Sequence, residues 1–165
     1  APRIPEPVVR EALRLVTGPG RFEYLEVPSE GGAGVQSVLI DGAHNPAGME
    51  VLRQSLDAYF PGQPRVLLLG ILHDKDIDKM LRTLVRPEDL VVMTPPQSDR
   101  AEKARVLAEE AAQYAQSVAY REDNVEALAL ALSLAQEGRL LVVAGSLYLI
   151  GGLRQLLLGK EDPHA

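Results

Sequence analysis

Hydrophobic and polar positions along the chain follow two periodicities in turn. Short continuous apolar runs, such as residues 66–69, are typical of strands buried on both faces of a sheet, whereas apolar residues spaced by three and four are typical of amphipathic helices. The pattern predicts strands over 21–27, 35–40, 65–72, 90–93, 118–120 and 140–144. It predicts helices over 7–16, 49–60, 76–85, 101–115 and 124–136, and a last helix that opens at Gly145 and Ser146.

The order of these elements predicts the fold class. Strands that alternate with helices indicate a parallel sheet covered on both faces. The Gly-rich segment 28–34 predicts a hairpin, and therefore one antiparallel strand at the front of the sheet. We expect one Rossmann-like α/β domain over residues 1–165, with three layers, a mostly parallel sheet of about six strands and helices on both faces. The polar tail, 159–165, is expected to fray.

Composition narrows the class of protein. The chain is 46% hydrophobic but only 4% aromatic, so its core must rest on aliphatic side chains. The net charge of -6 argues against nucleic acid or an anionic membrane as a partner. The absence of cysteine excludes disulfides, thiolate nucleophiles and thiolate-ligated metals. The same absence favours a cytoplasmic location. No apolar run approaches the ~18 residues of a membrane-spanning helix. Because the chain does not begin with Met, we expect a fragment or a processed product.

Polar or Gly-rich sequence follows four of the predicted strands, at 41–46, 70–78, 94–99 and 145–148. The carboxyl ends of parallel strands meet at one edge of the sheet, where open α/β domains bind their ligands. The sequence therefore predicts one site at this edge.

The segment Asp41-Gly42-Ala43-His44-Asn45-Pro46 is the most distinctive of the four. The Asp41 carboxylate can hold a ribose hydroxyl or a metal-bound water, and the His44 imidazole can donate to a phosphate or a carboxylate. Alternatively, Asp41 closes an Asx-turn while Asn45 and Pro46 begin the helix. Position alone leaves both interpretations open.

Single residues elsewhere carry weaker signals. Lys75 can bind an anionic substrate as a point charge or remain a solvated lysine, and a solvated loop position is favoured for His73. Arg21, which follows a tight turn, can contact a phosphate or be a lone surface arginine. Ser146 offers a hydroxyl and helix N–H groups to an anion, and also suits the N-cap. The remaining expectations are helix capping by Asp76, Asp78, Asn124 and either Ser98 or Asp99, and packing by Tyr148.

Several motifs are missing. No G-x-x-x-x-G-K-[ST] segment occurs, so the chain has no P-loop, and no G-x-G-x-x-G follows a strand. The three histidines are not spaced as a zinc site, and no metal ligands are predicted. No G-x-S-x-G nucleophile elbow occurs.

Five segments, in order, resemble the C-terminal domain of the folylpolyglutamate synthase family, including its bifunctional dihydrofolate synthase relatives, within the Mur ligase superfamily. They are 19–23, 41–46, 70–76 with Met80 and Leu81, 94–96 and 145–148. The resemblance implies that ATP and Mg²⁺ are used to join L-glutamate to the carboxylate of a folate or dihydropteroate through an acyl phosphate. It also implies that an N-terminal ATPase domain, absent from this chain, carries the P-loop and the main Mg²⁺ ligands, so the chain alone is expected to be inactive.

The resemblance also implies residue roles. Arg21 and Asp41 match nucleotide-contacting positions, and His44 faces the transferred phosphate or the incoming amino acid. His44 and Asp41 are the implied catalytic residues, and Asn45, Lys75 and Ser146 match the glutamate side. Two alternatives stay open: the C-terminal domain of another Mur-type ligase, and a stand-alone module that binds an acidic metabolite. The 41–46 motif favours the folate branch.

Overall fold

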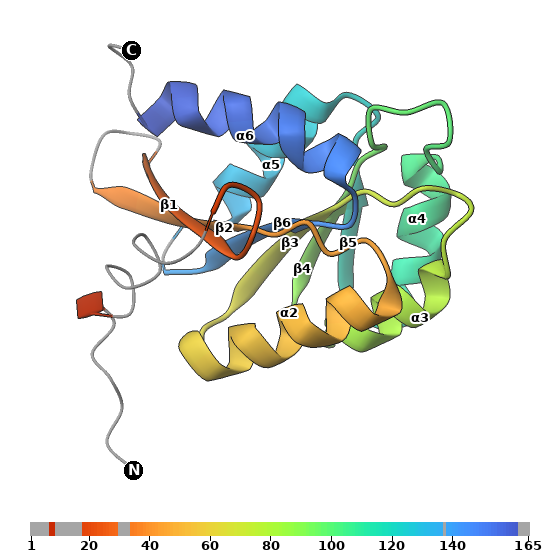
Figure 1. Cartoon of the computed structure of the whole chain (residues 1–165), viewed down its shortest axis with the longest axis horizontal. Coiled ribbons are helices and arrows are strands. Elements are labelled where there is room, and N and C mark those ends of the chain that lie inside the picture. Colours follow the sequence, from red (N-terminus) through yellow and green to blue (C-terminus); the bar gives the residue numbers. More distant parts are fainter. Residues whose placement is uncertain (1–6, 9–17, 30–33, 137, 162–165) are drawn as a thin grey trace.

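The structure is a computed structural model that describes residues 7–8, 18–29, 34–136 and 138–161. A six-stranded sheet lies between two layers of helices (Figure 1). The elements are β1 (Glu23–Pro28), β2 (Val35–Ile40), α2 (Pro46–Tyr59), β3 (Arg65–Leu69), α3 (Ile77–Leu84), β4 (Leu90–Met93), α4 (Ala104–Ala111), β5 (Ser117–Tyr120), α5 (Asn124–Leu134), β6 (Leu140–Ala144) and α6 (Leu147–Glu161).

The strand order is β1-β2-β6-β3-β4-β5, with β1 and β2 antiparallel and every other pair parallel. The predicted three-layer fold with one antiparallel strand is confirmed. The chain runs outward from β3 through β4 to β5, and then returns to place β6 on the other side of β3. The helices that follow β3 and β6 therefore leave toward opposite faces, which opens a crevice at the carboxyl ends of these two strands.

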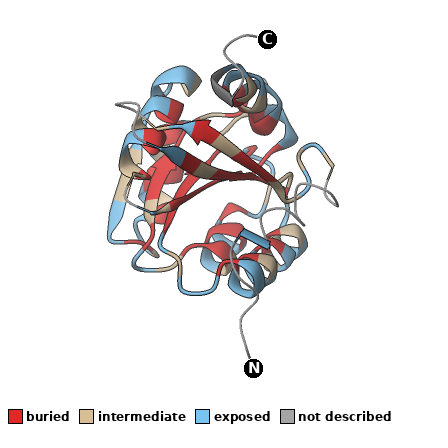
Figure 2. Cartoon of the chain, turned by 90° about the vertical axis from the view of Figure 1, so that its left-hand side faces the viewer, coloured by how far each residue is buried: buried red, intermediate tan, exposed pale blue. Residues whose placement is uncertain are grey.

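Two apolar clusters hold the layers together. Side chains of α2, α3 and α4 cover one face of the sheet, and those of α5 and α6 cover the other. Strands β3 and β6 are buried at every position, as continuous apolar runs predict. Figure 2 shows buried residues along the strands and on the helix surfaces that face them. Strand β1 contributes to both clusters, since Tyr24 packs with one and Leu25 and Val27 with the other.

Some predicted boundaries were wrong. Helix α2 begins at Pro46 instead of position 49, since the Asn45 side chain caps it by accepting from Gly48 N at 2.7 Å. Strand β3 ends at Leu69, three residues early. At the other end of the chain α6 continues to Glu161, so the tail does not fray from position 159. Most of the predicted helix 7–16 and of loop 28–34 lies outside the described residues.

Two predicted caps were also wrong. The cap of α5 is Asp123, which accepts from Val125 N and Glu126 N, while the Asn124 amide donates to Thr94 Oγ1 and Pro95 O at 2.8 Å each. Helix α4 begins only at Ala104, after Lys103, and so neither Ser98 nor Asp99 caps it. At α5 the difference arises because the Asn124 amide bonds to the loop after β4, whereas the Ser98 hydroxyl accepts from Arg100 N at 3.1 Å within its own loop. The predicted cap of α3 by Asp76 is confirmed.

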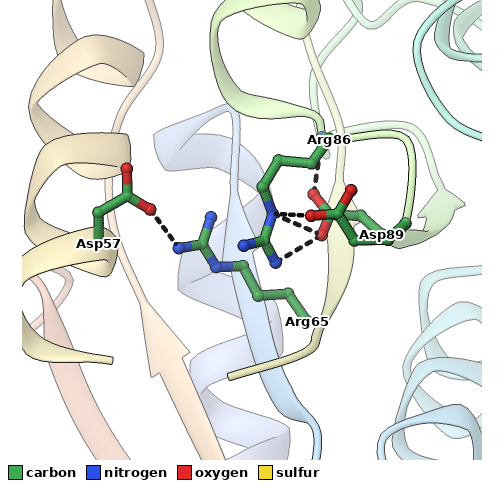
Figure 3. Close-up of polar contacts among 5 residues, drawn as sticks. Asp57, Arg65, Arg86 and Asp89 are labelled. Carbon is green, nitrogen blue, oxygen red and sulfur yellow. Dashed lines mark hydrogen bonds and ion pairs between the residues drawn. The ribbon is translucent and has the colours of Figure 1, made fainter. Parts of the chain in front are cut away.

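Two buried charges, Arg65 and Asp89, lie at the amino ends of β3 and β4, and Figure 3 shows their ion pairs. Arg65, the first residue of β3, is 1% exposed and donates to Asp57 of α2 at 2.7 Å. Before β4, the buried Asp89 carboxylate accepts from Arg86 N at 2.8 Å, Nε at 3.0 Å and Nη2 at 2.8 Å. The first pair joins α2 to the sheet and the second closes the turn before β4, so their role is structural.

Among the helices in the described ranges, none has both the length and the apolar character that crossing a bilayer requires.

Replacing Asp89 with Asn should destabilise the fold by about 1–3 kcal/mol, because an amide NH₂ would face buried N–H donors of Arg86. Equilibrium urea unfolding measures the change. The matched control is Glu109→Gln, which breaks the exposed ion pair with Arg105 on α4 and should cost less than about 0.5 kcal/mol. Equal losses in the two variants would mean that the burial of Asp89 adds nothing.

Candidate functional site

A pocket of about 200 Å³ lies at the crevice between the carboxyl ends of β3 and β6. Its lining comes from the segments after β2, β3, β4 and β6, as the sequence predicted for one shared site. The lining residues are His44, Leu72, Lys75, Arg100, Gly145, Ser146, Leu147 and Tyr148. A second hollow, of about 440 Å³, lies beside Pro87 and Tyr114, and no charged side chain lines it. Charge and position in the fold therefore identify the smaller pocket as the candidate site.

Two glycines allow the strand ends to come this close. A Cβ on Gly145, whose φ is +113°, would lie 2.4 Å from Gly70 O, and a Cβ on Gly70 would lie 2.4 Å from Thr94 O. Any larger residue would push the backbones apart. Gly145 N also donates to Ala43 O at 2.9 Å, which holds the 41–46 segment beside the start of α6.

The ring of His44 has a defined tautomer. Its Nδ1 lies 2.9 Å from Gly42 O. A carbonyl oxygen can only accept, so Nδ1 carries a proton and donates it to this bond. In the neutral ring Nε2 is then left as an acceptor for a ligand in the pocket that His44 lines.

Lys75 and Ser146 join His44 in the pocket. Lys75 is half-buried in the turn before α3, where its N–H donates to Leu72 O at 3.2 Å. Ser146 is 1% exposed, and its Oγ accepts from Tyr148 N at 3.1 Å, so it serves as the predicted N-cap of α6. Tyr148 itself is exposed on the pocket wall, which contradicts the packing role expected for it.

Arg100 is a pocket residue that the sequence did not reveal. The loop after β4 pairs with the loop after β3: His73 N donates to Arg100 O at 2.7 Å, and Glu102 N to Ile71 O at 3.1 Å. The Arg100 guanidinium also donates to Asp74 at 2.9 Å. The pairing of two loops that are 25 residues or more apart decides this placement. The only sequence signal was an arginine one residue beyond the Pro-rich segment.

Asp41 lies outside the pocket and ties two turns together. Its Oδ1 accepts from Phe22 N at 2.9 Å and its Oδ2 from Ala43 N at 3.0 Å, so the Asx-turn is present. Burial raises the pKa of Asp41, and the two backbone donors oppose this effect. Gly42 N donates to Gly20 O at 2.8 Å and completes the connection. The exposed Arg21 stands in the turn that Asp41 holds.

The predicted site residues thus form three groups. His44, Lys75 and Ser146 share the pocket, Arg21 and Asp41 belong to the neighbouring pair of turns, and Asn45 is an exposed helix cap. Within the described ranges, no group of three or more His, Asp or Glu residues is arranged to hold a metal ion. The pocket lining carries two cationic side chains, those of Lys75 and Arg100.

The Asp41→Asn variant should alter how stability depends on pH. Because its pKa is raised above the ordinary 3.8, folded Asp41 keeps its proton to a higher pH than the unfolded chain does. The folded state then binds more protons in the interval that begins near 3.8 and extends upward, so this group's contribution to stability falls as pH rises. Urea unfolding from about pH 3 to 6 should show that the free energy of unfolding of the variant loses less with rising pH than that of the unsubstituted protein. An identical pH dependence in both proteins would contradict the assignment.

Comparison with known proteins agrees with this geometry. The family model for the Mur ligase, glutamate ligase domain, matches residues 20–147. The folylpolyglutamate synthase of Lacticaseibacillus casei is 32% identical over 155 residues, which are 93% of this chain and 33% of that protein. The UDP-N-acetylmuramoyl-L-alanyl-D-glutamate--2,6-diaminopimelate ligase of Caldanaerobacter subterraneus is 33% identical over 148 residues, 86% of this chain and 30% of that protein.

Similarity extends to solved structures. Mycobacterium tuberculosis folylpolyglutamate synthase complexed with ADP matches with a TM-score of 0.72 at 34% identity, over 87% of this chain and 33% of that chain. The chain belongs to the Mur ligase family, as its glutamate ligase domain. The chain spans only part of its curated relatives. It covers 33% of the Lacticaseibacillus casei protein and 18% of a probable bifunctional folylpolyglutamate synthase/dihydropteroate synthase of Halobacterium salinarum.

Proposed function

We propose that the complete protein carrying this chain is a cytoplasmic, ATP-dependent ligase that adds L-glutamate to a folate or dihydropteroate through an acyl phosphate. The observation that carries the proposal is the pocket at the β3–β6 crevice, where Lys75, Arg100, His44 and Ser146 converge. Two cationic side chains beside a hydroxyl and a helix N-terminus suit a small ligand with two carboxylates.

Each pocket residue has a role in this reaction. Lys75 and Arg100 bind the glutamate carboxylates, and Ser146 donates its hydroxyl to one of them while its Oγ caps α6. Nε2 of His44 accepts a hydrogen bond from the glutamate amine and orients it for attack on the acyl phosphate. Outside the pocket lining, Asn45 uses its Oδ1 to cap α2, which leaves its NH₂ to donate to the bound glutamate.

The nucleotide belongs beside the paired turns. Bound ATP supplies the phosphoryl group that activates the folate carboxylate, and such transfer needs positioning and charge stabilisation. The exposed Arg21 guanidinium suits a phosphate, and Asp41 holds its turn and retains lone pairs for a ribose hydroxyl. As the family resemblance implies, we assign the P-loop and the main Mg²⁺ ligands to an N-terminal ATPase domain of the complete protein. Closure of the two domains would keep water from the acyl phosphate.

A second Mur-type ligase reaction is the alternative, favoured by the 33% identity to the diaminopimelate ligase. Both candidates would use a cationic pocket for an amino acid. They differ in the acceptor and in the amino acid, which is 2,6-diaminopimelate for the ligase of this second kind. A stand-alone binding module would instead hold glutamate without any partner domain.

Release of ADP by the complete protein should require L-glutamate together with dihydropteroate or tetrahydrofolate. The same assay on residues 1–165 alone should detect no ATP turnover. His44→Ala should lower kcat in the complete protein by about 10²-fold or more, because the amine loses its orienting acceptor. Turnover with 2,6-diaminopimelate and a UDP-N-acetylmuramoyl-L-alanyl-D-glutamate acceptor, and none with glutamate and either pterin, would favour the alternative ligase. Turnover by the isolated chain would overturn the need for an ATPase domain.

The two halves of the site should respond to different variants. Lys75→Met should raise the KM for glutamate about tenfold or more, with the KM for ATP changed less than about twofold, since one charge-assisted contact is lost. Arg21→Met should produce the reverse pattern. Lys79→Met is the matched control, because Lys79 is an exposed lysine of α3 outside the pocket. A rise in both KM values for each variant would contradict the division into glutamate and nucleotide halves.

A further inference from the structure

An ion pair joins α6 to the first residue of β1, next to the turn that carries Arg21. Arg154 of α6 donates from Nε to Glu23 Oε1 at 2.9 Å and from Nη2 to Glu23 Oε2 at 3.0 Å. The pair is largely shielded, with side-chain exposures of 24% for Arg154 and 13% for Glu23. A bidentate pair in such a setting fixes the orientation of both side chains.

Glu23 also contacts the turn that carries Arg21. Its Oε1 also accepts from Gly20 N at 2.9 Å, across the residues that flank Arg21. Burial raises the pKa of Glu23, but the bonds from Arg154 and Gly20 outweigh it, so the pKa is lowered overall and the carboxylate is ionised at neutral pH.

The turn has an unusual backbone that needs such support. Gly20 has a φ of +71°, and Phe22 has a φ of +46°, which is rare for a residue with a side chain. Three hydrogen bonds hold these two residues. Gly20 N donates to the Glu23 carboxylate, Gly20 O accepts from Gly42 N, and Phe22 N donates to the Asp41 carboxylate. Arg21 is thereby held from both sides.

The pair also keeps the Glu23 carboxylate occupied. Glu23 lies two residues from Arg21 and is the nearest acid along the chain that could capture its guanidinium. Both Glu23 oxygens are bonded to Arg154, and among the residues that the structure describes Arg21 makes no ion pair. Its exposed guanidinium thus stays available to a ligand.

We propose that Arg154 and Glu23 act as a positioning pair that holds the 18–22 turn and presents Arg21 to the nucleotide. This inference rests on the proposed nucleotide contact of Arg21. Neither residue of the pair touches the pocket, so the pair acts through Arg21.

The test is a double-mutant cycle in the complete protein, with ADP binding and the KM for ATP as measurements. Arg154→Met removes the donors and keeps an apolar stem. It should weaken ADP binding and raise the KM for ATP by about 5- to 20-fold, with kcat at saturating ATP and the KM for glutamate changed less than about twofold. In an Arg21→Met background the same change should add less than about twofold, because the positioned side chain is gone.

Two further variants keep the test decisive. Glu23→Gln preserves size and an acceptor for Gly20 N, and should give the same pattern even where Arg154→Met fails to fold. Arg154→Lys, which keeps the charge and one donor, should restore part of the ADP affinity. Arg105→Met, which breaks the exposed ion pair on α4, is the matched control and should change neither measurement.

The outcomes separate the two proposals. Two outcomes would overturn the positioning pair alone. In the first, the effects of Arg154→Met and Arg21→Met on ADP binding multiply in the double variant. In the second, Arg21→Met weakens ADP binding while Arg154→Met and Glu23→Gln leave it unchanged. Unchanged ADP binding in Arg21→Met would overturn the nucleotide contact of Arg21, and the positioning role with it.

Discussion

The close approach of three backbones at the carboxyl ends of β3, β4 and β6 is the constraint on which the site depends. Gly70 lies so close to Thr94 O, and Gly145 so close to Gly70 O, that neither glycine has room for a Cβ. Because the helices after β3 and β6 then leave toward opposite faces, the crevice receives one turn from each side. The same approach brings Gly145 N to Ala43 O, so the 41–46 segment joins the site from β2.

The molecule separates its charges by function. At the amino ends of the strands, Arg65 and Asp89 are buried and paired: Arg65 joins α2 to the sheet, and Asp89 closes the turn before β4. At the carboxyl ends, Lys75 and Arg100 line a pocket together with the first residues of α6. A chain with a net charge of -6 therefore presents a local cationic site. Net charge describes the whole surface, while binding depends on the few side chains that the topology gathers.

Much of the fold followed from periodicity. The apolar runs at β3, β4 and β6 predicted central parallel strands, and two of these predictions, 90–93 and 140–144, have the observed bounds. The helix starts were predicted less well at α4 and α5, since capping depends on which partner a polar side chain finds in space. Asn124 shows this directly, because Thr94 and Pro95 take its amide and Asp123 caps the helix.

The sequence by itself determined the three-layer architecture, the position of the site at the strand ends and the family resemblance, because these depend on local periodicity and on short contiguous motifs. Only the tertiary structure decided which motif residues meet. Arg100 lines the pocket because two loops pair in the tertiary structure. Asp41 joins the Arg21 turn to the 41–46 segment through its hydrogen bond from Phe22 N. The tertiary structure also connected Arg154 to Glu23 across 131 positions. Such contacts depend on strand order and loop packing, which no short stretch of sequence encodes.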